Sequence, residues 1–297
     1  MQSNKASTDI SSGFSNETFS PLPGCLADIG RRTLVMGILN ATPDSFSDGG
    51  QFTNTKQAIE HALFMIDSGA DIIDIGGEST RPGADPVPLE AELERVIPII
   101  ESLSKTTDVC ISIDTYKSAV AKHALKAGAD IVNDISSLSD PDMASVVAKA
   151  KVPVILMHIK GNPKDMQVAP YYDSLIDEIK SFLETKIRLA IDSGIAADLI
   201  IIDPGIGFGK TIQHNLEIIR RLGEFKSLGK PILIGTSRKS FIGKILKIDS
   251  PSDRTEGTSA TVAISIANGA DIIRIHDVKE MARVARMTDA IVRDITC

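Results

Sequence analysis

The sequence predicts a single (β/α)8 barrel, the TIM-barrel form of the α/β class, on three observations. Short apolar runs alternate with amphipathic segments eight times, and no gap is long enough for a second domain. The phrases SGADIIDIG, AGADIVNDI and NGADIIRIH recur at 68–76, 127–135 and 268–276, each leading from a helix ending in glycine into a buried strand. The apolar run Leu199–Ile202 enters Asp203 and a glycine-rich loop, as buried parallel strands do. Right-handed crossovers close eight such units into a barrel, and an open doubly wound sheet is the alternative.

The strands are expected wherever a short run of Val, Ile and Leu is bounded by turn residues. In chain order they are predicted at 34–40, 70–76, 109–115, 130–135, 153–159, 199–203, 231–236 and 271–276. Helices are expected where apolar residues recur at helical spacing, as in the stripe of Ala58, Leu63 and Ile66. In chain order they are predicted at about 55–68, 89–104, 117–127, 141–150, 172–193, 212–228, from 240, at 256–268 and at 278–295.

The N-terminal segment differs from the rest of the chain. Residues 1–20 are rich in Ser, Asn and Thr and show no hydrophobic periodicity. Such a composition is typical of a disordered tail. We therefore expect a tail at 1–20 and one barrel domain at 21–297.

Composition excludes several classes of function. The chain has 297 residues and a net charge of −7, whereas general nucleic-acid binders are usually basic. It has no tryptophan and 4% aromatic residues, which disfavours a surface for stacking bases. No apolar run approaches membrane-spanning length, so neither a membrane span nor a signal peptide is expected. Cys25, Cys110 and Cys297 form no metal motif or disulfide framework, so a reducing cytoplasm is expected.

Five predicted strands carry a polar residue at or near the carboxyl end: Asn40, Asp114, Asn133, Asp203 and His276. Because side chains alternate along a strand, each shares a face with the residue two positions earlier. Each alone could be a buried polar group bonded to local amides. Together they lie at the end where barrels keep active sites, which favours a functional site.

Asp74 is different, because it lies inside its predicted strand. We expect it to be a buried carboxylate with satisfied hydrogen bonds rather than a ligand group. The segment after the seventh strand, TSRKS at 236–240, combines cations and hydroxyls at a helix start, a combination that can hold an anion. Arg81 and Arg274 provide guanidinium groups suited to phosphate oxygens.

Seven segments of the chain resemble dihydropteroate synthase, and they occur in that family's order. They are NATPDSFSDGG (40–50), GGESTRPGA (76–84), SIDT (112–115), NDIS (133–136), DPGIGFGK (203–210), GTSRKSFIG (235–243) and RIHD (274–277). The resemblance covers essentially all of the chain after the tail. Two departures are Ala41 in place of the more usual Val, and MHIKGNP at 157–163 in place of an MHM-x-GTP segment. With no fused pyrophosphokinase or aldolase domain, the chain is similar to the stand-alone bacterial form.

The resemblance implies a cytoplasmic transferase of folate biosynthesis. The family condenses p-aminobenzoate with (7,8-dihydropterin-6-yl)methyl diphosphate, giving 7,8-dihydropteroate and diphosphate. It also implies Mg²⁺ as cofactor, a homodimer, inhibition by sulfonamides, and no nucleic-acid or membrane partner.

Site residues carried over by the resemblance fall into three subsites. Those implied for the pterin diphosphate are Thr80, Asp114, Asn133, Met157, Asp203, Phe208, Lys239, Arg274 and His276. Those implied for p-aminobenzoate are Phe46, Thr80, Arg81, Pro82, Lys239 and Ser240. Asn40 is implied for Mg²⁺, and the catalytic residues implied are Asp114, Lys239, Arg274 and His276.

The chemistry of these side chains agrees with the implied reaction. Asp203 can accept two N–H donors from a pterin, Asn133 can both donate and accept, and Asp114 can accept a further ring N–H. The same Asp114 carboxylate could stabilise a cationic pterin methylene after the diphosphate leaves. Two alternatives remain: a pterin-dependent methyltransferase barrel, which would not need the cations at Arg81, Lys239 and Arg274, and a barrel that binds a pterin or phosphate without catalysis.

Overall fold

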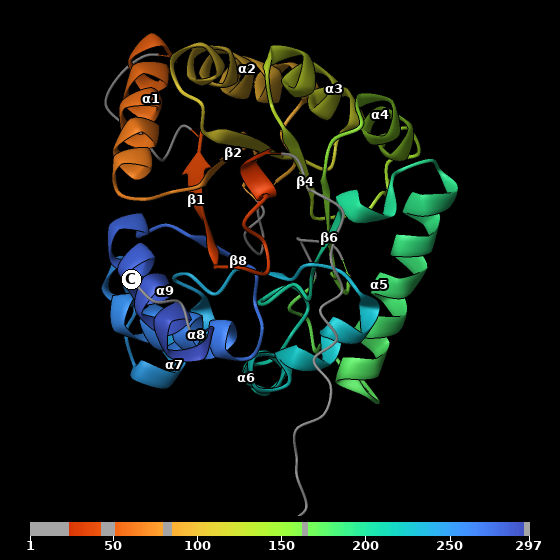
Figure 1. Cartoon of the computed structure of the whole chain (residues 1–297), viewed down its shortest axis with the longest axis vertical. Coiled ribbons are helices and arrows are strands. Elements are labelled where there is room, and N and C mark those ends of the chain that lie inside the picture. The colour runs from red at the N-terminus through yellow and green to blue at the C-terminus, as the bar shows by residue number, and fades with distance from the viewer. Residues whose placement is uncertain (1–23, 43–50, 80–84, 162–165, 294–297) are drawn as a thin grey trace, which may run out of the picture.

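An eight-stranded parallel sheet lies at the centre of the protein and is surrounded by helices (Figure 1). The computed structural model describes residues 24–42, 51–79, 85–161 and 166–293. The strands are β1 Leu34–Asn40, β2 Ile72–Gly76, β3 Cys110–Asp114, β4 Ile131–Asp134, β5 Val154–Met157, β6 Ile200–Asp203, β7 Leu233–Ile234 and β8 Ile272–Ile275. Their order is β6-β5-β4-β3-β2-β1-β8-β7. A bridge between Ile202 and Ile232 joins the two ends, so the predicted (β/α)8 barrel is confirmed.

The helices follow the strands as predicted. They are α1 Gln51–Asp67, α2 Leu89–Thr106, α3 Ser118–Ala127, α4 Met143–Ala150, α5 Leu175–Asp192, α6 Ile212–Arg220, α7 Ser240–Leu246, α8 Thr255–Ala267 and α9 Val278–Val292. Short 3-10 turns lie at Gly24–Leu26, Ala197–Leu199, Leu222–Leu228 and Pro251–Asp253. The helix expected at 212–228 is therefore wrong in its second half, where the 3-10 turn contains Gly223.

The recurring phrase has one structural cause in all three places. Gly69, Gly128 and Gly269 have φ values of 103°, 113° and 100°, in the left-handed region. Glycine reaches this region at little cost, which ends the helix and turns the chain into the next strand.

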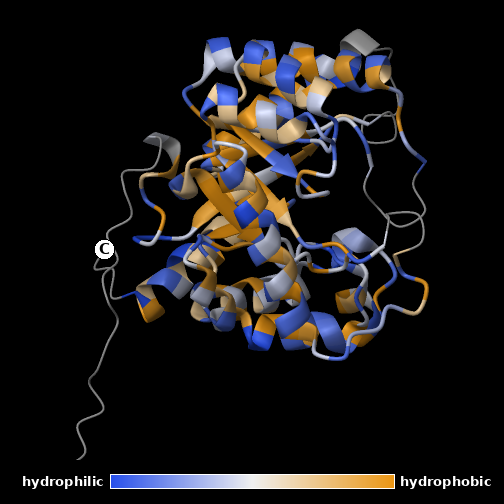
Figure 2. Cartoon of the chain, turned by 90° about the vertical axis from the view of Figure 1, so that its right-hand side faces the viewer, coloured by the Kyte–Doolittle hydropathy of each residue, from blue (hydrophilic) through white to orange (hydrophobic). Residues whose placement is uncertain are grey.

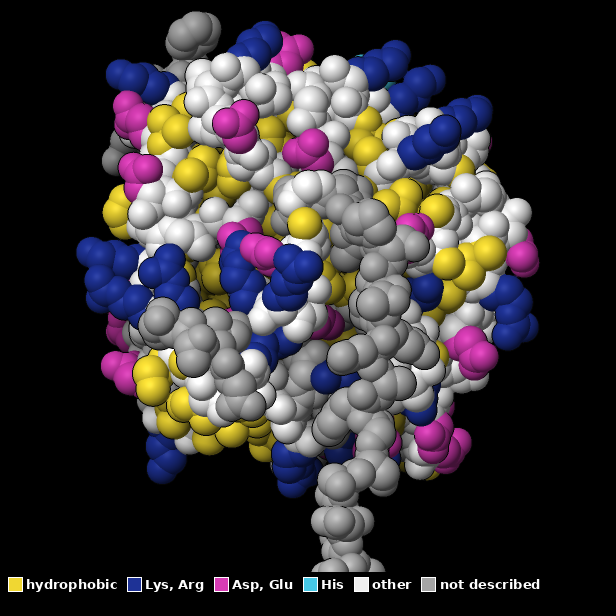
Figure 3. Space-filling model, viewed as in Figure 1, with side chains coloured by type: hydrophobic (Ala, Val, Ile, Leu, Met, Phe, Trp, Pro, Cys, Tyr) yellow, Lys and Arg dark blue, Asp and Glu magenta, His cyan; other side chains and the backbone are white. Residues whose placement is uncertain are grey.

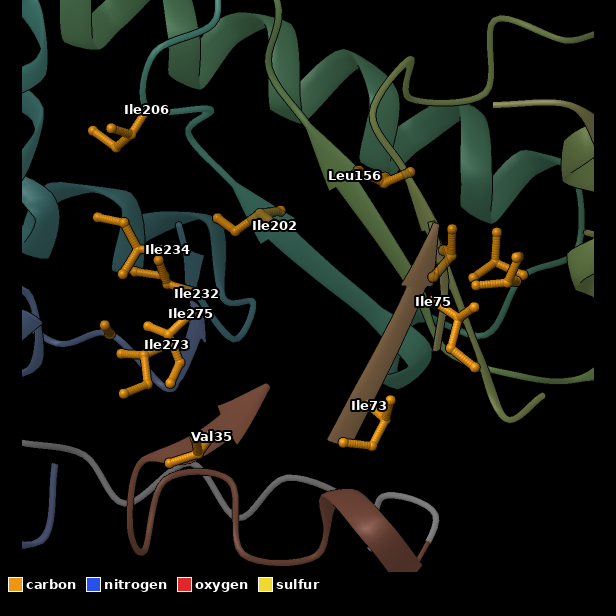
Figure 4. Close-up of a cluster of buried hydrophobic side chains, with 14 of the residues drawn as sticks. Val35, Ile73, Ile75, Leu156, Ile202, Ile206, Ile232, Ile234, Ile273 and Ile275 are labelled. Carbon is orange, nitrogen blue, oxygen red and sulfur yellow. The ribbon is translucent and has the colours of Figure 1, made fainter. Parts of the chain in front are cut away.

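Outward-facing strand residues pack under the helices. Figure 4 shows side chains such as Ile73, Ile75, Ile202 and Ile273 in this layer. In Figure 2 the strands are largely hydrophobic, while the covering helices combine hydrophobic and hydrophilic residues. Each fully buried aliphatic side chain here contributes about 1.5–3 kcal/mol of transfer free energy.

Inward-facing strand residues form a separate apolar layer at the amino ends of the strands. This layer contains Leu34, Met36, Ile72, Cys110, Ile131, Ile155, Ile201, Leu233 and Ile272. Leu26 and Ile29, from the turn before β1, pack against it and are buried. The barrel is therefore closed by apolar side chains at its amino end, and its polar residues lie above this layer.

The structure bears differently on the expectations for the N-terminal tail, for membrane spans and for disulfides. The tail at 1–20 lies outside the described residues. None of the described helices has the length and apolar character needed to cross a bilayer. The expectation of no disulfide is wrong, because Cys110 is disulfide-bonded.

Candidate active site

Polar side chains lie directly above the apolar layer inside the barrel. On four strands the residue two positions after an apolar-layer residue is polar: Asp74 follows Ile72, Asn133 follows Ile131, Asp203 follows Ile201, and Arg274 follows Ile272. On β3, Ser112 and Asp114 continue the same face. The alternation predicted from the sequence is thus confirmed, and it places these groups inside the carboxyl end of the barrel.

Arg274 is held between two buried carboxylates. Its Nε donates to Asp74 Oδ2 and its Nη2 donates to Asp114 Oδ2, both at 2.6 Å. Asn133 Nδ2 also donates to Asp74 Oδ2, at 3.1 Å. Asp74 was not among the predicted ligand groups, yet it bonds directly to two of them, Asn133 and Arg274. Through Arg274 it is also connected to the predicted residue Asp114.

The expectation for Asp74 is only half right. Its side chain is completely buried, and Oδ2 accepts two hydrogen bonds, but Oδ1 has no hydrogen-bond partner among the described residues. Within the part of the chain that the structure describes, Asp114 Oδ1 and Ser112 Oγ are also buried without a partner. The register pairs Asp74 with Ser112, so both belong to the same level of the barrel. Unpartnered buried polar atoms are costly, so this level of the barrel favours a further hydrogen-bonding partner.

The electrostatics of this group are set by burial. Burial raises the pKa of the Asp114 carboxyl to about 7, Arg274 opposes the rise, and the neighbouring Asp74 charge adds to it. Two carboxylates face one guanidinium, so a proton or a cationic ligand is favoured between them.

A second group lies around the glycine-rich segment after β6. Asp203 is buried opposite Met157 in the register of β5 and β6, and its Oδ1 accepts the Gly205 N–H at 2.7 Å. Burial raises the pKa of Asp203, while the Gly205 N–H and the charge of Lys239 oppose the rise. Lys239 Nζ lies 4.4 Å from the centre of the Phe208 ring. Burial lowers the pKa of Lys239 to about 8, with Asp203 opposing.

His276 lies beside Ser237, which the sequence indicated only as part of the TSRKS segment at 236–240 and not as a site residue. The Ser237 hydroxyl accepts the His276 backbone N–H at 3.1 Å and lies 2.9 Å from Nδ1. When that hydroxyl donates to Nδ1, the ring proton is on Nε2. The position of Ser237 after β7 would have identified it as a rim residue, but its role requires knowing which side chain it faces.

Asn40 and His276 line one cavity of about 420 Å³ together with Arg238 and residues of α1. Arg238 is paired there with Asp277. Within the described ranges, no three His, Cys, Asp or Glu side chains form a metal-holding group. A single amide oxygen fits Mg²⁺ only as an ion that keeps its waters and meets substrate oxygens.

The remaining predicted residues are divided between the helix start and the loops. Ser240 is exposed at the first position of α7, next to Lys239. Phe46, Thr80, Arg81 and Pro82 lie outside the described residues.

Comparison with known proteins identifies the family. Pterin binding enzymes match residues 36–276. A dihydropteroate synthase of Synechocystis is 53% identical over 274 residues, covering 92% of this chain and 95% of that protein. The chain belongs to the dihydropteroate synthase family.

Solved structures of dihydropteroate synthases agree with this assignment. The Yersinia pestis enzyme, in a complex with a sulfonamide drug, has a TM-score of 0.85 and 46% identity, covering 89% of this chain and 96% of that one. The Xanthomonas albilineans enzyme, in complex with 7,8-dihydropteroate, has a TM-score of 0.82 and 38% identity, covering 91% of this chain and 99% of that one. The resemblance noted in the seven motifs is therefore confirmed.

Proposed function

We propose that this protein is a dihydropteroate synthase. It condenses p-aminobenzoate with (7,8-dihydropterin-6-yl)methyl diphosphate, giving 7,8-dihydropteroate and diphosphate in folate biosynthesis. The observation that carries this function is the layer of buried, partly unpartnered acceptors above the apolar floor of the barrel. Its family relatives support the same reaction.

The pterin is recognised by acceptors and donors of the barrel interior. Asp203, with one oxygen on Gly205, presents a second oxygen to ring N–H groups. Asp114 Oδ1 is an unpartnered buried acceptor for a further N–H, and Asn133 supplies an amide edge. Met157 and Phe208 contribute apolar contacts, Thr80 adds a hydroxyl, and Lys239 donates to a ring carbonyl or nitrogen.

The leaving diphosphate is held by cations at the rim. Arg274 and His276 counter the negative charge that develops on it. Asn40 would hold a Mg²⁺ ion, which when bound supplies further charge neutralisation on the diphosphate oxygens.

The reaction breaks one C–O bond and forms one C–N bond. The electron pair of the C–O bond leaves with diphosphate, and the Asp114 carboxylate stabilises the cationic methylene that remains. The amine of p-aminobenzoate attacks in its neutral form and then loses a proton, so a strong base is not needed. Asp114, Lys239, Arg274 and His276 are the catalytic residues of this proposal.

The p-aminobenzoate subsite is assigned to the loops. Lys239 and exposed Ser240 lie at the start of α7, and Phe46, Thr80, Arg81 and Pro82 complete the subsite. Sulfonamides carry an aniline opposite an anionic group, so they compete there. The complex of the Yersinia pestis relative with a sulfonamide supports this assignment.

A homodimer is supported by an apolar surface on the C-terminal helices. Ile264 of α8 and Met287 and Ile291 of α9 are each more than half exposed. Figure 3 shows hydrophobic side chains gathered at its lower left, over the region of α7 and α8 in Figure 1. Sedimentation should give a dimer at micromolar concentration, and Ile264→Lys with Met287→Lys should give a monomer. A wild-type monomer would contradict the proposal.

A cytoplasmic location follows from the substrate. A pterin diphosphate is too highly charged to cross a lipid bilayer unaided, so it is used where it is made. The disulfide at Cys110 is unusual for a reducing compartment. Alkylation of thiols in intact cells would show whether Cys110 is oxidised there.

Diphosphate release tests the function directly. It should be fast with p-aminobenzoate and slow without it, whereas a methyltransferase or a simple binder would show no dependence on p-aminobenzoate. Excess chelator should suppress turnover while a pterin lacking the diphosphate still binds. Full activity in chelator would remove the Mg²⁺ role of Asn40.

A further inference from the structure

A buried lysine and a buried histidine lie behind the candidate site, outside the contacts assigned above. Lys210 ends the glycine-rich segment after β6, and His158 follows β5; they are 3% and 4% exposed. Lys210 Nζ lies 2.9 Å from His158 Nδ1 and 3.0 Å from the Phe208 carbonyl oxygen. These acceptors are neutral, so the pair carries a desolvation cost that packing alone does not require.

The histidine is fixed as an acceptor. Its ring packs edge-on against Phe182, with ring centres 4.9 Å apart, and lies near the Tyr172 ring. Burial and the charge of Lys210 lower the pKa of His158 to about 2, so the ring is neutral. Nδ1 therefore accepts from the Lys210 ammonium, and the ring proton is on Nε2.

The glycine-rich segment lies directly on the chain after β5. Gly205 has φ of 72° and Gly209 has φ of 63°, and a Cβ on either would collide with the carbonyl oxygen of His158 or Lys160. The Tyr172 hydroxyl donates to the Gly209 carbonyl at 2.9 Å. The hydrogen bonds from Lys210 to His158 and to the Phe208 carbonyl also join the glycine-rich segment to the chain after β5, in the protein interior.

Both ends of the segment carry site residues. At its start, the Gly205 N–H fixes Asp203 Oδ1. Near its end, Lys210 holds the Phe208 backbone, and the Phe208 ring lies under the Lys239 ammonium. Displacing this backbone would move the Phe208 ring and Lys239 together.

We propose that Lys210 and His158 are positioning residues for the pterin: their hydrogen bond holds the Asp203–Phe208 segment in the geometry that binds the ring. This proposal rests on the proposed function. Neither residue touches substrate; both act through Asp203, Phe208 and Lys239.

Charge supports the same role. Burial lowers the pKa of Lys210 to about 7, Asp203 opposes the fall, and Lys239 and Lys160 add to it. The ammonium in turn counteracts the rise of the Asp203 pKa caused by burial. The other titratable groups around the pair are Tyr172, before α5, and His214, on α6. Deprotonating Lys210 removes its charge and one of its three N–H donors, which weakens the remaining hydrogen bonds, so its contribution to pterin binding should fade above neutral pH.

Calorimetric titration with a pterin lacking the diphosphate tests the proposal. At pH 6.5, Lys210→Met should raise the dissociation constant at least tenfold, and the difference from wild type should shrink to less than threefold at pH 9. Lys149→Met is the control, since Lys149 is an exposed lysine near the end of α4. It should change the constant less than twofold.

The histidine variants separate positioning from simple stability. His158→Asn keeps an acceptor close to the Nδ1 position and should bind within threefold of wild type, whereas His158→Leu should match Lys210→Met. A Lys210→Met protein that melts earlier yet binds pterin normally would overturn the proposal, as would equal losses in His158→Asn and His158→Leu. Should Lys210→Met not fold, the two histidine variants decide. Absence of pterin binding by wild type would instead refute the proposed function.

Discussion

Arg274 lies between Asp74 and Asp114, so this part of the site holds two carboxylates and one guanidinium. The excess negative charge is tolerated because Asp114 can hold a proton. We expect this arrangement to bind a cationic group well, at the expense of the stability of the protein without ligand.

Replacing Asp114 by Asn should therefore stabilise the fold above neutral pH. The pKa of Asp114 rises from 3.8 to about 7 on folding. The protonated Asp114 carboxyl favours the folded state. This contribution to the free energy of unfolding is fully present below pH 3.8 and is lost as the pH rises through 7. Relative to wild type, Asp114→Asn should gain about 2 kcal/mol or more between pH 5 and pH 8.5. Urea unfolding at both pH values measures this, and an equal difference at both would contradict it.

Replacing Asp203 by Asn should weaken pterin binding. The variant presents an amide donor to ring N–H groups that also donate, which should cost about 2–4 kcal/mol. Calorimetry with a pterin analogue measures the loss, and Asp198→Asn before β6 is the control. An unchanged affinity would remove Asp203 from the pocket.

At the residue scale, the sequence identified most of the interior groups because alternation along a strand is strict. Asp114, Asn133 and Asp203 were found in this way. Asp74 was assigned a structural role because its position in the middle of a strand does not reveal that Arg274 reaches it from β8, 200 residues away.

At the scale of elements, an ion network joins the segment after β2 to α2 and α3. Lys117 pairs with Glu78 and Glu92, and Thr115 Oγ1 donates to Glu92 at 2.7 Å. The Tyr116 hydroxyl donates to Glu78 at the same distance. The network ties the base of the second loop to the residues directly after Asp114.

Lys117→Met should destabilise the protein by about 3–5 kcal/mol, because it leaves two carboxylates without their cation in a largely buried position. Chemical denaturation measures the loss. Lys122→Met, on the exposed face of α3, should be near neutral. Adding Glu92→Gln to Lys117→Met should recover part of the stability, and no recovery would argue against unpaired charge as the cause.

Substitutions in the first and second loops should separate inhibitor from substrate. A sulfonamide extends beyond the carboxylate position of p-aminobenzoate toward the loops, so Phe46→Leu and Pro82→Ser should weaken the inhibitor more. The difference should be about 1–3 kcal/mol. Steady-state kinetics gives the ratio of the inhibition constant to KM, and an unchanged ratio would mean that the subsite is misplaced.

Element boundaries were predictable where strands are apolar on both faces, as for β1, and less so at the ends of helices. The seventh strand is only Leu233–Ile234, shorter than its apolar run, and the preceding residue Ile232 makes an isolated bridge to β6. The first helix begins at Gln51, inside the predicted loop. The roles of the loop residues were predicted only from the resemblance of their motifs to the family. Loop geometry depends on contacts that hydrophobic periodicity does not encode.

For the whole molecule, the disulfide at Cys110 predicts a redox-dependent stability. Removing a native disulfide typically costs about 2–5 kcal/mol. Reductant should therefore lower the melting temperature of wild type but not of Cys110→Ser. The same melting temperature for wild type with and without reductant would contradict a stabilising bond. Spacing alone could not reveal this pairing, because three scattered cysteines have no signature.

The apolar floor made by Leu26, Ile29 and the first strand residues closes the amino end of the barrel within the described part of the chain. Every ligand must arrive and depart through the carboxyl end. The residues proposed to bind the pterin lie just above the floor, so a molecule bound nearer the rim would block the way to them. We therefore expect ordered binding, in which the pterin diphosphate enters first and p-aminobenzoate follows. p-Aminobenzoate that binds early would delay binding of the pterin diphosphate rather than assist it.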